Sequence, residues 1–233
     1  MTQSETEVRL QRAIQSFWEA RARNLKKQQE SGRIDAGTRG AVTAGTQMGA
    51  LEVLITDIVC EFGLDRTHVK TRTSLELPGY YRSEKKWDLI VVSEGELVLA
   101  MEFKSQVGPS FGNNFNNRSE EAIGSATDIW TAFRESRFGI SPKPFLGYLV
   151  LLEDCPKVHK PVRNKEPYFA VDPAFRGDSK GSKGAREKFS GVSYHARYEL
   201  LCRRLVLEQK YSAACLLLAT NEEPCVITQR HED

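Results

Sequence analysis

The sequence predicts a mixed α/β protein in which helices flank a central β-sheet. Patterns typical of amphipathic helices come first, two β-rich runs joined by a short turn follow, and two nearly continuous apolar runs lie further along the chain. Apolar runs of strand length are typical of strands that are covered on both faces. The 233 residues are 40% hydrophobic and 27% charged, which fits one folded domain and excludes a disordered or fibrous chain.

The first quarter of the chain is expected to form two helices. Residues 4–30 repeat apolar side chains at spacings of three and four from Leu10 to Trp18, and residues 47–62 show the same pattern. Residues 31–46 between them are rich in glycine and are expected to form a loop. Because this loop lacks the GKS or GKT ending of a phosphate-binding loop, we assign it no nucleotide site.

The segments that follow are expected to build the sheet. Residues 67–77 indicate a short strand, while WDLIVV (87–92) and LVLAMEFK (97–104) indicate a hairpin across the turn SEGE. A loop over 108–117 is then expected to lead into a helix over 118–136, with Asn117 as N-cap and Glu120 completing a capping box. The remaining elements expected are a strand over 145–153, a helix over 194–209, a strand over 211–220 and a short strand at CVIT (225–228).

Residues 155–193 differ from the rest of the chain in charge. They hold nine Lys and Arg against four Asp and Glu, together with four Pro and four Gly. This composition fits either a solvated surface loop or a positively charged arm that meets a polyanion. The expected organisation is a single domain with N-terminal helices over 4–62, an α/β core over 67–153 and 194–228, and this basic loop region.

Composition excludes several classes of protein. The net charge of +2 does not by itself indicate a nucleic-acid partner, so any basic surface must be local. Five cysteines without a CxxC pair and four scattered histidines provide no zinc framework, and they fit the reduced thiols of an intracellular protein. The first residues lack an apolar signal core and no apolar run reaches about 18 residues, so we expect a cytoplasmic protein that does not contact the membrane.

Three charged residues of the predicted hairpin carry the chemical argument. Asp88 lies at the start of the first strand, and Glu102 and Lys104 lie at the end of the second, on one face because strand side chains alternate. Asp88 joins that face if it lies opposite Glu102, which requires Ser93 to face Leu97 across a three-residue loop. A slip of one residue would place Asp88 on the other face.

Two carboxylates held together repel each other unless a cation lies between them. Oxygen ligands favour a hard divalent ion such as Mg²⁺, which keeps several of its waters. The ammonium of Lys104 can orient a metal-bound water and stabilise developing negative charge, and its neutral amine form can deprotonate that water, so the set suits in-line attack on a phosphodiester. The pattern D…(D/E)xK is the signature of a large nuclease superfamily, although such triplets also occur by chance.

Each of these residues also has an ordinary structural explanation. Asp88 can be a strand-end residue, and Glu102 with Lys104 a cross-strand or exposed charged pair. Glu102 and Lys104 lie at the end of an apolar run, where burying a charge without a partner costs free energy. Their position therefore favours the interpretation as an active site. Glu52, beside the apolar stripe of the second helix, is either a third metal-holding carboxylate or a solvated glutamate. Gln106 continues the face of Glu102 and can touch the same site or DNA.

The string KSQVGPSFGNNFNNRSEEA (104–122) is unusual. Together with WDLIVV, LLEDCP (151–156), EPYF (166–169) and RYELLCRRLVLE (197–208), it resembles the XhoI family of type II restriction endonucleases, over nearly the whole chain. The chain departs from the wider PD-(D/E)xK superfamily in having Trp87 where proline precedes the aspartate.

The resemblance implies a restriction-endonuclease-like core and a Mg²⁺-dependent endonuclease for double-stranded DNA. It implies the palindromic target CTCGAG, cut after the first C to leave a 5′ overhang, and a partner methyltransferase that protects host DNA. A palindromic target in turn suggests a two-fold symmetric homodimer. In the mechanism that we expect, Asp88, Glu102 and the Phe103 carbonyl bind the metal, and Lys104 acts on the attacking water.

Amide and basic side chains are the candidates for DNA contact. Asparagine can pair with adenine and arginine with guanine in the major groove, although these asparagines can instead cap turns. Besides Gln106, the candidates are Asn113, Asn114, Asn116, Asn117, Arg118, Arg163, Arg176, Lys180, Lys183, Arg186 and Lys188.

Two other functions stay open from the sequence. Another PD-(D/E)xK nuclease, acting in repair or on junctions, would nick DNA by structure and not by sequence. A DNA-binding module with an inactive site would retard CTCGAG duplexes and leave them intact. A nucleotide-binding α/β protein is disfavoured, because no GxGxxG or GxxxxGK[ST] follows a predicted strand.

Overall fold

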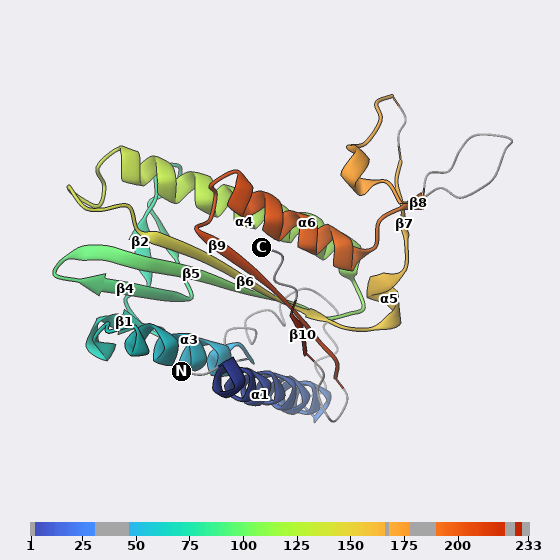
Figure 1. Cartoon of the computed structure of the whole chain (residues 1–233), viewed down its shortest axis with the longest axis horizontal. Coiled ribbons are helices and arrows are strands. Elements are labelled where there is room, and N and C mark those ends of the chain that lie inside the picture. Colours follow the sequence, from blue (N-terminus) through green and yellow to red (C-terminus); the bar gives the residue numbers. More distant parts are fainter. Residues whose placement is uncertain (1–2, 31–46, 166–167, 178–189, 222–226, 230–233) are drawn as a thin grey trace, which may run out of the picture.

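A mixed six-stranded sheet lies between two layers of helices in the computed structural model of the chain (Figure 1). The structure describes residues 3–30, 47–165, 168–177, 190–221 and 227–229. Helices α1 and α3 cover one face of the sheet, and α4 and α6 cover the other. The predicted α/β fold, a mixed sheet flanked by helices, is therefore confirmed.

The strand order in the sheet is β1-β4-β5-β6-β9-β10. The pairs β5–β6 and β6–β9 are parallel and the others antiparallel. The strands are β1 (Val69–Lys70), β4 (Leu89–Ser93), β5 (Glu96–Gln106), β6 (Phe145–Glu153), β9 (Ala213–Ala219) and β10 (Ile227–Gln229). Separate ribbons are formed by β2 (Glu76–Pro78) with β3 (Glu84–Lys86), and by β7 (Val162–Arg163) with β8 (Ser190–Gly191).

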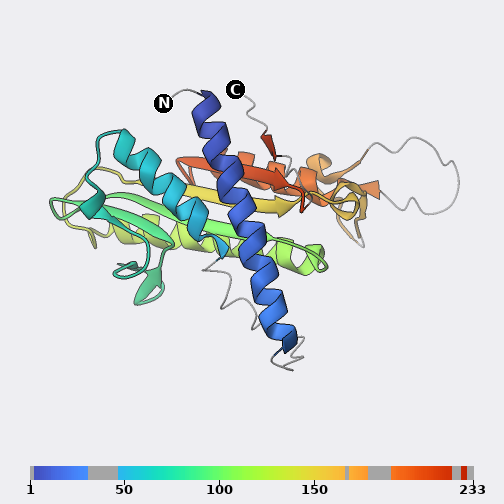
Figure 2. The same ribbon diagram turned by 90° about the horizontal axis from the view of Figure 1, so that it is seen from below.

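The principal helices match the predicted apolar patterns. Their bounds are α1 (Gln3–Glu30), α3 (Gly49–Glu61), α4 (Phe111–Arg134) and α6 (Tyr194–Leu207). Shorter helical turns are η2 (Arg66–His68), α5 (Pro156–His159) and η3 (Pro173–Phe175). Seen from below the sheet, α1 crosses beside α3 (Figure 2).

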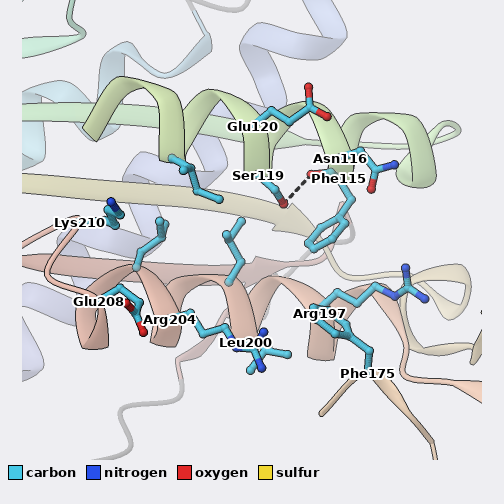
Figure 3. Close-up of a pocket in the computed structure, with 13 residues that line it drawn as sticks. Phe115, Asn116, Ser119, Glu120, Phe175, Arg197, Leu200, Arg204, Glu208 and Lys210 are labelled. Atoms are coloured by element: carbon cyan, nitrogen blue, oxygen red, sulfur yellow. Dashed lines mark hydrogen bonds between the residues drawn. The ribbon is translucent and has the colours of Figure 1, made fainter. Parts of the chain in front are cut away.

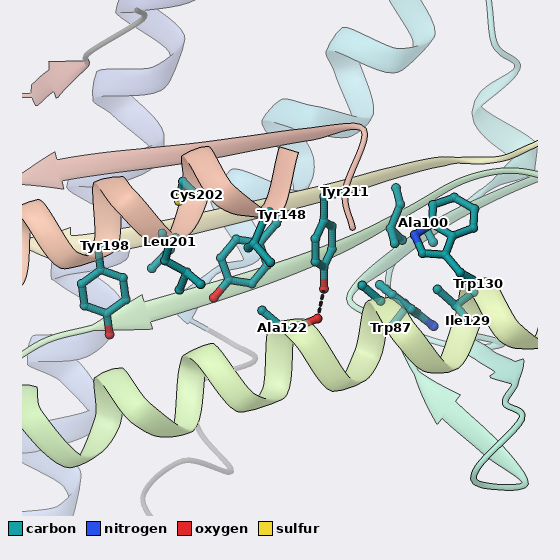
Figure 4. Packing of buried hydrophobic residues seen from close by; sticks show 14 of the residues in the cluster. Trp87, Ala100, Ala122, Ile129, Trp130, Tyr148, Tyr198, Leu201, Cys202 and Tyr211 are labelled. Atoms are coloured by element: carbon teal, nitrogen blue, oxygen red, sulfur yellow. Dashed lines mark hydrogen bonds between the residues drawn. The ribbon is translucent and has the colours of Figure 1, made fainter. Parts of the chain in front are cut away.

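Strand β6 shows why the central apolar runs form strands. Its side chains alternate between the two cores: Tyr148 and Val150 pack toward α4 and α6, whereas Leu149 and Leu151 pack toward α1 and α3. Figure 4 shows the aromatic part of the α4–α6 core, including Tyr148. Both faces are covered, so an apolar run without polar alternation is the stable sequence for this position.

The predicted turn of the β4–β5 hairpin is wrong, but the predicted position of Asp88 is right. Ser93 pairs with Glu96, so the turn consists of two residues, Glu94 and Gly95. Their φ angles are 53° and 82°. Such a turn matches the twist of paired strands. A β-bulge between Val91 and Val92 then shifts the register back by one residue, as bulges do.

The predicted start of the third long helix is also wrong. Helix α4 begins at Phe111 and not at 118, so Asn117 lies inside it and is not its N-cap. Phe111 and Phe115 are one turn apart and contact the rings of Tyr194 and Tyr198 on α6. Burial of these aromatic side chains offsets the low helix propensity of glycine and asparagine.

Three further expectations are refined. Two short strands begin within residues 67–77, and 155–193 contain α5, β7, η3 and β8 within the described part. Cysteines 60, 155, 202 and 215 carry free thiols, as expected, and Cys225 lies outside the described residues. Among the described helices, none has the length and apolar character needed to cross a membrane.

Replacing Leu151 by alanine is expected to lower the free energy of unfolding by about 3 kcal/mol, because the side chain is fully buried between the sheet and α1. Urea unfolding followed by circular dichroism measures this change. The control is Leu25→Ala on α1, where the side chain is 48% exposed and the expected change is below about 0.5 kcal/mol. Equal losses in both variants would contradict the described packing.

Candidate active site

Glu102 is a buried carboxylate at the carboxyl half of β5. It is 2% exposed, and its Oε1 lies 2.7 Å from Lys104 Nζ and 3.1 Å from Lys85 Nζ. Tyr211, which follows α6, lies with its hydroxyl 3.1 Å from Glu102 Oε2. Burial alone favours the neutral carboxyl, but the two ammonium groups outweigh it and lower the pKa of Glu102. Glu102 is therefore a fixed anion at the site.

Asp88 immediately precedes β4 and joins this group through the backbone. Its Oδ2 accepts a hydrogen bond of 2.7 Å from the N–H of Phe103, the residue between Glu102 and Lys104. The pairing of Leu89 with Met101 places Asp88 beside Glu102, as the sequence predicted. Burial raises the pKa of Asp88, although the Phe103 N–H and the Lys104 ammonium oppose the rise.

Glu52 approaches Asp88 from α3, in a cleft whose lining does not include Glu102 or Lys104. It lines this cleft of about 860 Å³ together with Asp88, and the cleft wall also carries Arg23, Arg72 and Lys86. Burial first and the Asp88 carboxylate second raise the pKa of Glu52, Arg72 opposes the rise, and the net value is about 7. The cleft thus combines two mutually repelling carboxylates with basic side chains that attract a polyanion.

The donor set fits a hard divalent cation. Among the described residues, no three His, Cys, Asp or Glu side chains are close enough to form a complete ligand cage. Magnesium does not need one, since it is commonly held by one or two carboxylates and keeps its waters. Repulsion between Asp88 and Glu52 is what a cation would relieve. The Phe103 carbonyl points to the Asp88 side because its N–H does, so it can add a ligand.

Two residues of this site were missed by the sequence reasoning. Lys85 lies on β3, with its ammonium 4.3 Å from the Trp87 ring centroid as well as beside Glu102. Tyr211 is 109 residues from Glu102 in sequence, and Figure 4 shows its hydroxyl also facing the Ala122 carbonyl of α4. Lys85 had a usable signal, because basic residues precede Asp88, whereas no local pattern indicates Tyr211.

The predicted DNA contacts fall into separate places. Gln106 is 2% exposed and donates to the Val107 and Ser110 carbonyls, so it shapes the turn into α4. Arg118 is ion-paired with Glu121, which also lies 3.8 Å from Lys104. The first turns of α4 carry the four asparagines, of which Asn113, Asn116 and Asn117 are exposed and Asn114 is half-buried.

The basic candidates beyond β6 are only partly described. Arg163 is exposed on β7, and Arg176 is half-buried and bridges to Gly191. Lys180, Lys183, Arg186 and Lys188 lie outside the described residues. The structure brings none of the described members to Asp88, and contact of each with DNA stays a prediction.

An apolar hollow of about 440 Å³ between α4 and α6 is distinct from this site (Figure 3). Phe115, Leu200 and Phe175 line it, and Asn116 lies at its edge. None of Asp88, Glu102 and Lys104 contributes to it. Its two carboxylates, Glu120 and Glu208, come from different helical segments, and neither belongs to the D…ExK set.

The raised pKa of Glu52 predicts how stability depends on pH. The folded value of about 7 exceeds the unfolded value of about 4.3, so stabilisation by protonated Glu52 is complete below about pH 4.3 and is lost as pH rises through 7. Glu52→Gln should therefore flatten the fall in melting temperature of the metal-free protein between about pH 4.3 and 7. Asp88, shifted in the same direction, should leave a residual slope.

The control for this measurement is Glu19→Gln, which changes an exposed glutamate on α1 and should keep the wild-type slope. Calorimetric scans in EDTA at several pH values give the comparison. A Glu52→Gln protein with the wild-type slope would show that Glu52 does not titrate in this window.

Comparison with known proteins gives one consistent family. The profile of "Restriction endonuclease XhoI" matches residues 27–229. Type II restriction enzyme BstVI of Geobacillus stearothermophilus is 48% identical over 199 residues, which cover 83% of this chain and 82% of the relative. Type II restriction enzyme XhoI of Xanthomonas vasicola is 44% identical over 197 residues, covering 84% and 73%. Type II restriction enzyme AbrI of Azospirillum brasilense is 48% identical over 164 residues, covering 70% and 73%. No solved structure matches the chain significantly.

Proposed function

This chain belongs to the XhoI restriction endonuclease family, and we propose that it hydrolyses phosphodiester bonds of double-stranded DNA at the palindrome CTCGAG, after the first C. The observation that carries the chemistry is the buried Glu102 held by Lys104, with Asp88 bonded to the intervening Phe103 N–H. This arrangement fits the D…ExK set of a metal-dependent nuclease. The resemblance to named type II enzymes supports a sequence-specific target.

In the proposed mechanism each residue has a separate task. Asp88 and Glu102, with Glu52 and the Phe103 carbonyl as further candidates, hold Mg²⁺. When bound, the ion supplies charge neutralisation at the phosphate and lowers the pKa of a coordinated water. As an ammonium, Lys104 positions the attacking water and stabilises charge on the phosphate; in its neutral form it would instead accept the proton of that water. The products are a 5′-phosphate and a 3′-hydroxyl.

The target implies partners for the chain. A palindrome is read most simply by two copies related by a two-fold axis, so we propose a homodimer with one active site for each strand. We also propose a cognate methyltransferase that protects host DNA at the same sequence. Arg23, Arg72 and Lys86 of the cleft supply positive charge beside the carboxylates for the DNA backbone.

Digestion of a sequenced plasmid with Mg²⁺, followed by mapping of the ends, tests the function. We expect discrete fragments that end at CTCGAG with a 5′ overhang, and no cleavage in EDTA, because the carboxylates need a cation to act. Nicking without sequence preference would favour a repair or junction nuclease. Retardation of CTCGAG duplexes that stay intact with every divalent ion tried would favour a DNA-binding module.

A further inference from the structure

The turn between β2 and β3 displays two tyrosines to solvent. Tyr81 is 70% exposed and Tyr80 is 48% exposed, and their rings contact each other edge to face with centroids 4.9 Å apart. Figure 2 shows the β2–β3 ribbon standing away from the six-stranded sheet. Large exposed aromatic side chains placed together are typical of a binding surface and not of a solvated turn.

The turn is held rigidly by a buried carboxylate of α4. Asp128 is 2% exposed, and its Oδ1 accepts hydrogen bonds of 2.8 Å from the N–H groups of both Tyr80 and Tyr81. Its Oδ2 lies 2.8 Å from Nε of Arg82. At Gly79, a Cβ atom would lie 2.7 Å from Asp128 Oδ2, so only glycine fits there. Burying a charge is costly, and here both carboxylate oxygens fix the shape of an exposed turn.

The other end of the ribbon enters the candidate active site. Lys85 of β3 contacts Glu102, and Trp87 and Asp88 follow directly in the chain. At about 3.3 Å per residue, the tip at Tyr81 lies at most about 23 Å from Asp88, which is about seven base-pair steps of B-DNA. A phosphate at Asp88 therefore leaves the bases of a short target within reach of the tip.

Charge and dimensions favour duplex DNA as the ligand. Residues 66–87 carry six Lys and Arg against two Glu. A two-stranded β-ribbon fits the major groove, which is about 12 Å wide. The Arg82 side chain is 46% exposed, so guanidinium donors beyond Nε can reach base acceptors, and arginine pairs well with guanine.

We propose that the turn formed by Tyr80, Tyr81 and Arg82 enters the major groove of the target DNA and contributes to its recognition. This inference rests on the proposed function, since it assigns a contact surface to the same nuclease. Asp128 is then a positioning residue that presets the turn before DNA arrives.

The test compares binding of a short fluorescein-labelled duplex carrying CTCGAG, measured by anisotropy with Ca²⁺ in place of Mg²⁺. We expect Tyr81→Ala and Arg82→Ala to weaken binding by roughly 10-fold or more, the loss typical of an aromatic or arginine contact to bases. The matched control is Phe62→Ala, which removes an 85% exposed aromatic ring at the end of α3 and should bind within about twofold of wild type.

The outcomes separate this inference from the proposed function. If Tyr81→Ala and Arg82→Ala both bind the duplex with an affinity within about twofold of wild type, the inference is overturned and the nuclease proposal stands. A wild-type protein that neither binds nor cuts the duplex would overturn both. Sedimentation velocity of the free proteins is the second measurement: dissociation of Tyr81→Ala into monomers would assign the turn to an interface between copies and overturn the DNA contact.

Discussion

Replacing Lys104 by alanine is expected to reduce DNA cleavage by at least about 10³-fold, because its ammonium is the group placed to act on water and on developing phosphate charge. The side chain is 20% exposed and lies 2.7 Å from Glu102. Glu102 keeps Lys85 and Tyr211 as partners in the variant, so we expect the fold to persist and target binding to change by less than about threefold. Single-turnover cleavage and anisotropy measure the two quantities.

Lys85→Ala is the matched control, because Lys85 contacts the same oxygen of Glu102 from β3. If Lys104 acts on the water, Lys85→Ala should retain cleavage within about tenfold of wild type. Equal losses in the two variants would show that both lysines serve only as counter-ions of Glu102. Near-normal cleavage by Lys104→Ala would remove this lysine from the mechanism.

The sequence could place Asp88 beside Glu102 only as a condition on the hairpin register, because the apolar run of β4 is buried on both faces and does not distinguish them. A slip by one residue would turn every apolar side chain of β4 to the wrong core. The turn itself was beyond the sequence reasoning, since a two-residue turn with a bulge and a three-residue loop without one give the same register from Leu89 to Val91.

The start of helix α4 was predicted wrongly because the intrinsic propensity of the residues before 118 favours a loop. Its first turns are rich in asparagine and glycine, which favour loops by intrinsic propensity. The spacing of Phe111 and Phe115 carries the helical signal, and the rings of α6 that bury them lie about 80 residues later. Tertiary burial therefore decided a segment for which local propensity favoured a loop.

In the candidate site, residues of one hairpin could be predicted to lie together, whereas residues brought there by tertiary packing could not. Glu102, Lys104 and Asp88 share one hairpin, so alternation and register place them together. Tyr211 reaches Glu102 only through the packing of β9 and α6 against the sheet, and no periodicity relates two residues so far apart. Whether Glu52 lies near the site depends on the distance between α3 and Asp88. The amphipathic stripe of the helix does not specify that distance.

Glu102→Gln is expected to abolish cleavage by at least about 10³-fold and also to lower the free energy of unfolding by about 2–3 kcal/mol. The substitution keeps the shape of the side chain but takes the nearest anion from two ammonium groups, 13% and 20% exposed, of which Lys104 keeps only Glu121 at 3.8 Å. Breaking a buried pair costs more than the pair contributes, because the remaining charge stays desolvated. Tyr211 is not left without an acceptor, since its hydroxyl also lies 3.1 Å from the Ala122 carbonyl.

The double variant Glu102→Gln with Lys85→Met separates the two losses. Removing Lys85 relieves one uncompensated charge while its methylene stem stays packed, so unfolding in urea should recover by at least about 1 kcal/mol relative to Glu102→Gln alone. Cleavage should stay lost, because no carboxylate replaces Glu102. Recovery of cleavage along with stability would mean that Glu102 supports the fold and is no ligand. If Glu102→Gln alone is as stable as wild type, the positive charges of Lys85 and Lys104 do not need the Glu102 carboxylate as a counter-ion.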